Sequence, residues 1–428
     1  MQWNGQKIQV ISLGIGEIDT LGKEALQAIK SAEIIIGAKH HMETVDSLLY
    51  KNNKLEENSN IKKVLFPSPF NELAQTIEQN KNKAITILAS GDALFYGVGV
   101  WLAKNIGREH LVFHPNVSSM QVAFHRIGLA WQSAVIHSLH GRPLNSLNSR
   151  LQNGITLGLF TDEISNPVAI AEQLSQQGFG ESELWVCEAL GTDDERITQY
   201  KASDLLSADS KKHTFSQLNI CIVKCSGQNN CLNGVSGIAD ECFETGAVPG
   251  KGMITKREVR VSILSLMECH PNDVAWDIGA GCGSVSIEWA LQNKSGTIYA
   301  IENNQQRMDY LKTNNKKFGT ELNLKTLLGT APDGCTDLPV PDVVFVGGNG
   351  GNLLALLEFS FSSLQQGGRL VASAVMQNSV QALHEFANKY QQQKGEWIQI
   401  QVSKTSLLSE IDNLNELQPI TLLKVVKN

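Results

Sequence analysis

The sequence predicts an α/β protein of two domains, and three observations support this prediction. Apolar segments that fit strands alternate with segments that fit helices, as in mostly parallel sheets. A glycine-rich turn follows a strand in each half, at residues 14–16 and 279–283. Residues 225–248 lack apolar periodicity and are rich in Gly, Asn and Ser, which is typical of a domain boundary. The predicted domains are therefore residues 1–225 and 249–428, with 226–248 as a linker.

Composition favours an ordinary soluble globular protein. Hydrophobic residues make up 42% of the chain and charged residues 18%, and no apolar run is long enough to span a bilayer. The first residues show no signal-peptide pattern, so we expect a cytoplasmic protein without a membrane partner. The net charge of −7 argues against a nucleic-acid partner, because such partners usually select a basic surface.

The eight cysteines do not indicate a metal site. Four of them lie between residues 221 and 242, but their spacing matches no common zinc pattern. In a cytosolic chain of this size we expect all eight to be reduced. The sequence therefore predicts no metal.

The first half contains several segments with the apolar character of buried strands. Ser118 is placed to cap a helix that runs to Ile127. Further helices are expected at 22–31, 98–106 and 166–177. Strands are expected at residues 8–13, 33–37, 84–89, 111–114, 135–139, 156–160, 184–187 and 215–223.

The second half begins with a predicted helix. Thr255 followed by Glu258 fits a capping box, so the helix should start there and run to about Met267. Further helices are expected at 305–318 and 353–364. The last two strands have no helix between them and should pair antiparallel. Strands are expected at residues 274–278, 297–301, 324–328, 342–346, 368–375, 397–402 and 420–426.

The turn at 279–283 has the features of a nucleoside site. Its three alternate glycines permit backbone angles that a Cβ forbids and allow a ligand to approach the main chain. The following helix presents its free N–H groups to the turn. Glu302 ends the next strand about 20 residues further on, where a ribose would be bound. An NAD site would instead show Gly-x-Gly-x-x-Gly, whereas this chain has Asp-x-Gly-x-Gly-x-Gly.

This pattern resembles the first motif and the strand-two acid of class I S-adenosylmethionine (SAM) methyltransferases, which implies a seven-stranded Rossmann-like domain. The segments 255–260, 277–288, 329–332 and 346–351 are similar to the decarboxylating precorrin methyltransferases that act at carbon 15, over about residues 246–428. Cys282 and Asn349 depart from that pattern by small polar changes. The resemblance implies the following SAM contacts: Thr255, Gly279, Ala280, Gly281, Cys282, Gly283, Glu302 and Ala331.

The first half resembles the tetrapyrrole methylase family, in particular the branch that methylates carbon 5 of a precorrin. The matching segments are 14–16, 38–40, 90–97, 115–119 and 139–142, and the similarity covers about residues 8–223. Glu17 and Ala93 replace prolines that are usual in the family. The resemblance implies two α/β subdomains with SAM in the cleft between them. The SAM contacts that it implies are Gly14, Gly16, Ser90, Gly91, Asp92, Ser118, Ser119 and His140. For Asp92, a role as a helix cap is an equal alternative.

Together the two resemblances imply a bifunctional enzyme of cobalamin biosynthesis. It would methylate precorrin-6B, with or without cobalt, at carbons 5 and 15, remove the ring C acetate carboxylate as carbon dioxide, and yield precorrin-8X. It would use two SAM per turnover and no metal, and would form homo-oligomers. Substrate contacts are expected among Arg142, Asn349 and Gly350. Lys251, Lys256, Arg257 and Arg260 are further candidates for the substrate carboxylates, although each is individually more typical of a solvated surface charge.

Two alternative functions remain open from the sequence. One half of the chain could be inactive, so that the enzyme performs a single methylation. Alternatively, the second half could methylate RNA, which a basic stripe beside its cleft would favour. The sequence identifies no catalytic acid or base for the decarboxylation.

Overall fold

The structure, a computed structural model, describes residues 5–15, 20–51, 61–206, 214–229, 231–232, 236–347, 351–405 and 414–428. The chain divides into two compact units. The first comprises residues 1–140, 155–171 and 182–224, and the second comprises 141–154, 172–181 and 225–428. The second unit therefore includes two short segments that precede the predicted boundary at 225.

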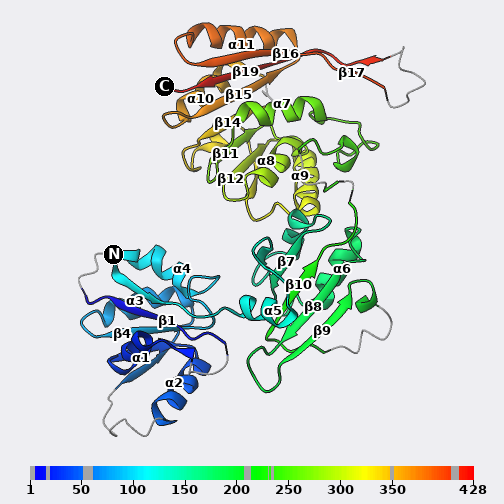
Figure 1. Cartoon of the computed structure of the whole chain (residues 1–428). Coiled ribbons are helices and arrows are strands. Elements are labelled where there is room, and N and C mark those ends of the chain that lie inside the picture. Colours follow the sequence, from blue (N-terminus) through cyan, green and yellow to red (C-terminus); the bar gives the residue numbers. More distant parts are fainter. Residues whose placement is uncertain are drawn as a thin grey trace. The chain divides into compact units, whose positions relative to one another are not determined.

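The first unit begins with a five-stranded parallel sheet in the order β3-β2-β4-β1-β5 (Figure 1). Its predicted strands are apolar and mostly buried, whereas β3 is largely exposed and was not predicted. The strands are β1 (Ile8–Ser12), β2 (Ile34–Gly37), β3 (Lys62–Leu65), β4 (Ile85–Ala89) and β5 (Leu111–His114). The helices between them are α1 (Lys23–Lys30), α2 (Lys39–Lys51), α3 (Leu73–Gln79) and α4 (Val98–Leu102).

A second five-stranded sheet follows, in the order β6-β7-β10-β8-β9. Only β6 and β7 are parallel, and the other pairs are antiparallel. Helix α5 (Ser119–Ile127) starts at Ser118, which forms the predicted cap as part of a capping box with Gln121, and it packs Phe124 into this sheet's core. The strands are β6 (Val135–Ser138), β7 (Thr156–Phe160), β8 (Glu183–Glu188), β9 (Arg196–Lys201) and β10 (Asn219–Lys224), and α6 spans Pro167–Gln176. The predicted pair of α/β subdomains is confirmed.

The second unit contains a seven-stranded sheet in the order β13-β12-β11-β14-β15-β19-β16 (Figure 1). The first five strands are parallel, and β19 runs antiparallel to both β15 and β16, which confirms the predicted class I methyltransferase architecture. The strands are β11 (Val274–Ile278), β12 (Thr297–Glu302), β13 (Leu324–Leu328), β14 (Val343–Val346), β15 (Arg369–Ala374), β16 (Gly395–Ile400) and β19 (Ile420–Val426). Strands β17 (Ser403–Lys404) and β18 (Asn415–Glu416) form a separate short pair.

Helices cover both faces of this sheet because its central strands are apolar on both sides. Ala275 of β11 packs in the core with α7, α8 and α9, whereas its neighbour Trp276 packs in the opposite core with α10 and α11. The same alternation repeats in β14 at Phe345 and Val344. The helices are α7 (Arg257–Met267), α8 (Ser284–Gln292), α9 (Gln305–Phe318), α10 (Leu353–Ser363) and α11 (Gln377–Lys389).

The predicted capping box at the start of α7 is wrong. The helix begins at Arg257, and its N-cap is Lys256, which makes no side-chain cap hydrogen bond. Both residues of the expected box are engaged elsewhere. The carbonyl oxygen of Thr255 accepts a hydrogen bond from Arg260, and Glu258 forms an ion pair with Lys404. The predicted end of the helix at Met267 is confirmed.

The segment 226–248 was expected to be a linker with reduced cysteines, and the described part of it is packed instead. Cys231 and Cys242 form a disulfide, so the prediction that all cysteines are reduced is wrong for this pair. Ile238, Cys242 and Phe243 are buried in the core beneath α7, α8 and α9. The sequence did not indicate this packing, because the apolar residues of the segment are irregularly spaced.

Two features are absent from the described residues. Within them, no helix combines the length and the apolar character needed to cross a membrane. Within the same residues there is no group of three or more His, Cys, Asp or Glu side chains placed to hold a metal ion.

The end of α9 generates a stability prediction. Gly319 caps this helix in the left-handed conformation, with φ of 67°, and a Cβ there would lie 2.2 Å from the backbone carbonyl oxygen of Asn145. Gly319→Ala should therefore lower the free energy of unfolding by about 2–5 kcal/mol, because backbone strain and overpacking add. Urea denaturation of the full chain measures the change.

Gly367 provides the matched control in the same unit. Its φ is also positive, at 77°, but a Cβ there would meet nothing within 4 Å. Gly367→Ala should cost only about 1–2 kcal/mol. Equal losses in the two variants would contradict the packing role of Gly319.

Candidate active site

A pocket of about 840 Å³ lies where the parallel strands of the seven-stranded sheet end. In open α/β sheets this edge, beyond the carboxyl ends of the strands, is where ligands bind. The structure brings most of the SAM contacts predicted for the second half together in its lining, which includes Thr255, Gly279, Ala280, Gly281, Cys282, Glu302 and Ala331. Among these predicted SAM contacts, Gly283 is the exception and does not line the pocket.

The turn after β11 is held from behind by the neighbouring strand. The N–H groups of Gly279 and Ala280 both donate to the carbonyl oxygen of Ile301, at 2.9 and 3.1 Å. Gly281 has φ of +59°, and a Cβ on it would meet nothing within 4 Å, so its conformation rather than crowding requires glycine. Gly283 also has a positive φ, of 83°, but a Cβ there would lie 2.9 Å from Cγ of Leu311, so both its conformation and its packing require glycine.

Glu302 joins the two strand ends that form the pocket. Its side chain is buried, with 2% exposed. Oε2 accepts the N–H of Gly281 at 2.8 Å, and Oε1 accepts the N–H of Asn304 at 2.9 Å. Arg307, which also lines the pocket, lies 3.9 Å from Oε1. Since a carboxylate has about four acceptor positions, Glu302 retains capacity for a ligand's hydroxyl groups.

Asp277 is a second buried acid beneath the turn. Its Oδ2 accepts a hydrogen bond from the Ser286 hydroxyl, while Oδ1 has no hydrogen-bond partner among the described residues. The pKa of Asp277 is raised to about 7, mainly by burial; the hydrogen bond from Ser286 lowers it and the charge of Glu302 raises it, and both effects are smaller than that of burial. The acid therefore changes its protonation near neutral pH.

The basic residues predicted to meet substrate carboxylates fall into different environments. Arg260 is fully buried in a polar network, so it is neither a surface charge nor available to a substrate. Lys256 lines the pocket, but its ammonium donates to the carbonyl oxygen of Gly250 at 2.8 Å. Arg257 and Lys251 are exposed. Arg142 is also exposed and belongs to the second compact unit.

A largely apolar wall of the same pocket was not predicted. Val375 and Met376 follow β15, and Ile400 and Val402 stand at the end of β16 and just beyond it. Met376 is 70% exposed, so this wall is open to a large partner. The rule that ligands bind at the carboxyl ends of parallel strands indicates Val375 and Met376, because they directly follow such a strand.

In the first unit, the residues predicted from three separate loops meet at one edge of the first sheet. Gly14 and Gly91 exchange two backbone hydrogen bonds of 3.1 Å each, which joins the loops after β1 and β4. A Cβ on Gly91 would lie 3.6 Å from Cα of Ser118 and 3.7 Å from the nitrogen of Ser119. The loop after β5 therefore adjoins the other two.

Ser90, in this cluster of loops, is oriented by His41. Nδ1 of His41 accepts the N–H of Ala38 at 3.1 Å, and Nε2 lies 2.8 Å from the Ser90 hydroxyl oxygen. Burial, together with the neighbouring His40, lowers the pKa of His41 to about 4. The neutral ring therefore carries its proton on Nε2 and donates it to Ser90. Nε2 of His40 lies 3.2 Å from the same oxygen, so the Ser90 hydroxyl proton can go to His40 or to a ligand acceptor.

The remaining predicted residues are less closely grouped. Asp92 accepts the N–H of Leu94 at 2.8 Å, as a turn-capping side chain does. His140 is exposed, with Nδ1 3.4 Å from the carbonyl oxygen of Thr161. Gly16, Asn349 and Gly350 lie outside the described residues.

Comparisons with known proteins cover both halves of the chain. A family described as "Tetrapyrrole (Corrin/Porphyrin) Methylases" matches residues 7–206, and one described as "Precorrin methyltransferase domain" matches residues 247–427. A decarboxylating precorrin-6Y C(5,15)-methyltransferase of Sinorhizobium sp is 34% identical over 372 residues, which cover 86% of this chain and 84% of that protein.

Two further relatives are also precorrin methyltransferases. A decarboxylating precorrin-6Y C(5,15)-methyltransferase of Mycobacterium tuberculosis is 27% identical over 91% of this chain and 92% of its own. A decarboxylating cobalt-precorrin-6B C(15)-methyltransferase of Salmonella typhimurium is 41% identical over 142 residues, which cover 33% of this chain and 70% of that protein.

Asp277→Asn should change how stability depends on pH. The pKa of Asp277 is about 7 in the folded chain against an ordinary value of 3.8. The protonated acid therefore contributes stability that is complete below pH 3.8 and is lost as pH rises through about 7. Asparagine does not ionise, so the variant does not lose this stability as pH rises. The free energy of unfolding of the variant minus that of the parent should therefore rise by at most about 1.4 kcal/mol per pH unit between pH 3.8 and about 7. Above about pH 7 the difference should be constant.

Urea denaturation of both proteins at a series of pH values measures this difference. Ser286→Ala is the companion variant, because it removes the hydroxyl that lowers the pKa of Asp277. In Ser286→Ala the pKa of Asp277 should be higher, so the loss of stability with rising pH should continue to a higher pH than in the parent. A difference between Asp277→Asn and the parent that is constant across pH would show that Asp277 does not titrate near 7.

Proposed function

Because the chain belongs to the family of decarboxylating precorrin-6Y C(5,15)-methyltransferases, we propose that it methylates precorrin-6B at carbons 5 and 15 with SAM. The same turnover releases the ring C acetate carboxylate as carbon dioxide and yields precorrin-8X. Two SAM are consumed, one for each carbon, and no metal is required. The observation that carries this proposal is the pocket in which Glu302 and the glycine turn meet.

We assign methylation of carbon 15 and decarboxylation to residues 249–428. In this assignment Glu302 accepts hydrogen bonds from the ribose hydroxyls of SAM, and the turn 279–283 admits its methionine end, beside Thr255 and Ala331. The pocket volume of about 840 Å³ supports this assignment, because ligand sites typically measure about 300–1,000 Å³. Domains of class I methyltransferase topology place SAM at the same edge of the sheet.

We assign methylation of carbon 5 to residues 1–225. In this assignment the loops that carry Gly14, Ser90 to Asp92 and Ser118 to Ser119 form the SAM site, together with Gly16 and His140. The backbone bridge between Gly14 and Gly91 supports the assignment, since it brings these loops together. The oriented hydroxyl of Ser90 would donate to a SAM acceptor.

The reaction depends more on the positioning of the methyl donor and the ring carbon than on acid–base groups. The sulfonium of SAM is a strong methyl donor, so in-line placement of the donor against the ring carbon supplies most of the rate. Decarboxylation leaves an electron pair on the former acetate carbon, and the conjugated macrocycle accepts it. The apolar wall at Val375 and Met376 suits one face of a flat macrocycle. Arg142, Lys251, Asn349 and Gly350 remain candidates for its polar edge.

Three expectations rest on the sequence and the family resemblance alone and stay proposals. These are a cytoplasmic location, a homo-oligomeric state, and the absence of nucleic-acid and membrane partners.

Calorimetry with SAM tests the number of sites. The parent chain should bind two SAM. Glu302→Ala should weaken one site by about 10- to 100-fold, because hydrogen bonds to a charged carboxylate contribute about 1.5–3 kcal/mol. Asp92→Ala should weaken only the other site. One SAM per parent chain, or displacement of SAM by NADH, would contradict the proposal.

Mass spectrometry of the product tests the division of labour. With precorrin-6B, and with SAM held near the Kd of the parent so that a weakened site stays largely empty, the parent should add two methyl groups and remove one carbon dioxide. Glu302→Ala should add one methyl group and retain the carboxylate, whereas Asp92→Ala should add one methyl group and still release carbon dioxide. Decarboxylation that persists in Glu302→Ala would refute the assignment to residues 249–428. A parent product with one added methyl group would show that half of the chain is inactive.

A further inference from the structure

Arg260 on α7 is a cation without any exposed surface, and every direction around its guanidinium group is occupied. Nε donates to Glu288, and Nη1 donates to the carbonyl oxygen of Thr255 at 2.6 Å and to Asp240 at 3.3 Å. Nη2 donates to the carbonyl oxygen of Ile238. The plane of the guanidinium lies over the ring of Phe243, with Cζ 4.8 Å from its centroid. Only arginine offers a planar fork with this set of donors.

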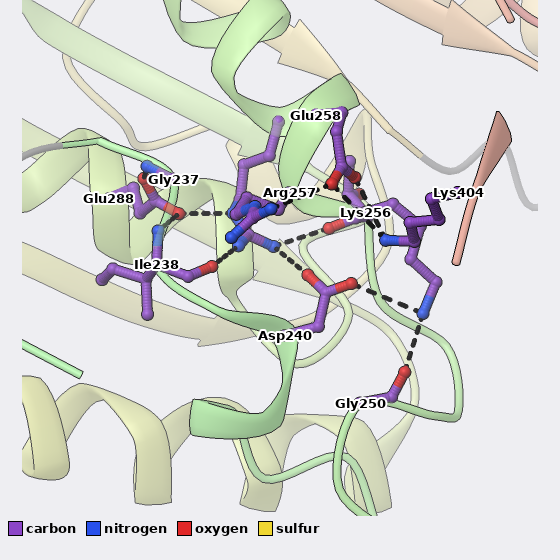
Figure 2. A network of polar contacts seen from close by, with 11 residues as sticks. Gly237, Ile238, Asp240, Gly250, Lys256, Arg257, Glu258, Glu288 and Lys404 are labelled. Atoms are coloured by element: carbon purple, nitrogen blue, oxygen red, sulfur yellow. Dashed lines mark hydrogen bonds and ion pairs between the residues drawn. The ribbon is translucent and has the colours of Figure 1, made fainter. Parts of the chain in front are cut away.

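The two carboxylates in this network are themselves held in place (Figure 2). Besides Arg260, Glu288 accepts the N–H groups of Gly237 at 2.6 Å and Ile238 at 3.0 Å. Asp240 forms a second ion pair, of 3.6 Å, with Lys256. Two cations and two carboxylates therefore balance, and the segment 237–240 is fixed against α7 and α8.

Stability alone is a weak reason for such a network. Removing charges from water costs several kcal/mol for each ion, and replacing a buried ion pair by apolar side chains is often neutral or stabilising. What the network supplies is geometry, because each of its hydrogen bonds fixes the position of a particular backbone or side-chain atom.

The positions that it fixes belong to two walls of the pocket. Thr255 and Lys256, which contact Arg260 and Asp240, line the pocket on one side. Glu288 lies on α8, the helix that follows the glycine turn on the other side. Arg260 does not itself line the pocket. It therefore links the wall 252–256 to the helix behind the turn without touching a ligand.

We propose that Arg260 is a positioning residue for the methyl-donor pocket: it sets the distance between the wall 252–256 and the glycine turn. This inference rests on the proposed function, because it takes the ligand of the pocket to be SAM. Loss of the guanidinium leaves the Thr255 carbonyl without its donor and the two carboxylates without their shared cation. The wall then shifts relative to the turn, and both SAM binding and the alignment of its methyl group suffer.

Arg369 provides a matched control within the same sheet. It is also a buried arginine, with 7% exposed, and it forms an ion pair with Asp273 and a hydrogen bond with His270. It stands at the first residue of β15, and Asp273 directly precedes β11, so this pair lies at the edge of the sheet opposite the pocket. Substitution of Arg369 removes a buried ion pair but leaves the pocket walls in place.

The experiment compares Arg260→Met, Arg260→Lys and Arg369→Met in the full chain. SAM affinity of the C-terminal site is measured by calorimetry, carbon dioxide release gives kcat and KM for SAM, and thermal unfolding gives Tm. All binding and rate measurements are made well below the lowest Tm. Arg260→Met should weaken SAM binding by roughly tenfold or more and lower kcat by up to about 100-fold, because a misplacement of about 1 Å has that effect.

The variants separate a positioning role from a structural one. Arg260→Lys keeps the charge but not the fork, and it should recover only part of the affinity and of kcat. Arg369→Met should lower Tm while leaving kcat and SAM affinity within about threefold of the parent. Where Arg260→Met does not fold, Asp240→Asn is measured instead, and it should weaken SAM binding with little loss of Tm.

Unchanged SAM affinity and kcat in folded Arg260→Met, or in Asp240→Asn where it replaces that variant, would overturn the inference. Equal effects of Arg260→Met and Arg369→Met on kcat would overturn it as well, because they would reveal only general destabilisation. Failure of the proposed function is distinguishable, since the parent chain itself would then bind no SAM at this site.

Discussion

The hydrogen bond from the Gly281 N–H to the carboxylate of Glu302 is the contact on which the pocket of the second unit depends. It joins the turn after β11 to the end of β12, and it fixes a turn whose glycine has no side chain to hold it. Two further N–H groups of the turn donate to Ile301, in the same strand. The floor of the pocket is therefore built from one strand end that presents acceptors and one turn that presents donors.

Both units use the same physical device with different sheets. Parallel strands bring their carboxyl ends to one edge, and glycines there allow backbones to approach closely. In the second unit the approach is between a turn and a carboxylate, whereas in the first unit it is between the backbones of Gly14 and Gly91. In each unit, polar side chains also order the groups at this edge of the sheet. Arg260 contacts one wall of the pocket in the second unit, and neutral His41 orients Ser90 in the first unit.

Much of the fold could be predicted because its strands carry a strong local signal. The buried strand Val274–Ile278 and the Ser118 cap are examples in which neighbouring residues determine the outcome. Strand Arg196–Lys201 was missed, since it is a partly exposed edge strand without an apolar run. Thr255 fits a cap by its spacing to Glu258, but α7 begins at Arg257 and Lys256 occupies the N-cap position. Spacing alone also did not distinguish Gly283, which packs on Leu311, from Gly281, which faces open space, because that difference depends on tertiary contacts.

The bridge between Gly14 and Gly91 has a consequence for how this protein can change over evolution. Surface loops usually accept inserted or deleted residues independently of one another. Here two loops, separated by more than seventy positions, share a single pair of reciprocal backbone bonds. An insertion in either of the two loops would therefore displace both of them. Lengths of these loops are thus expected to vary jointly among descendants of a common ancestor, or not at all.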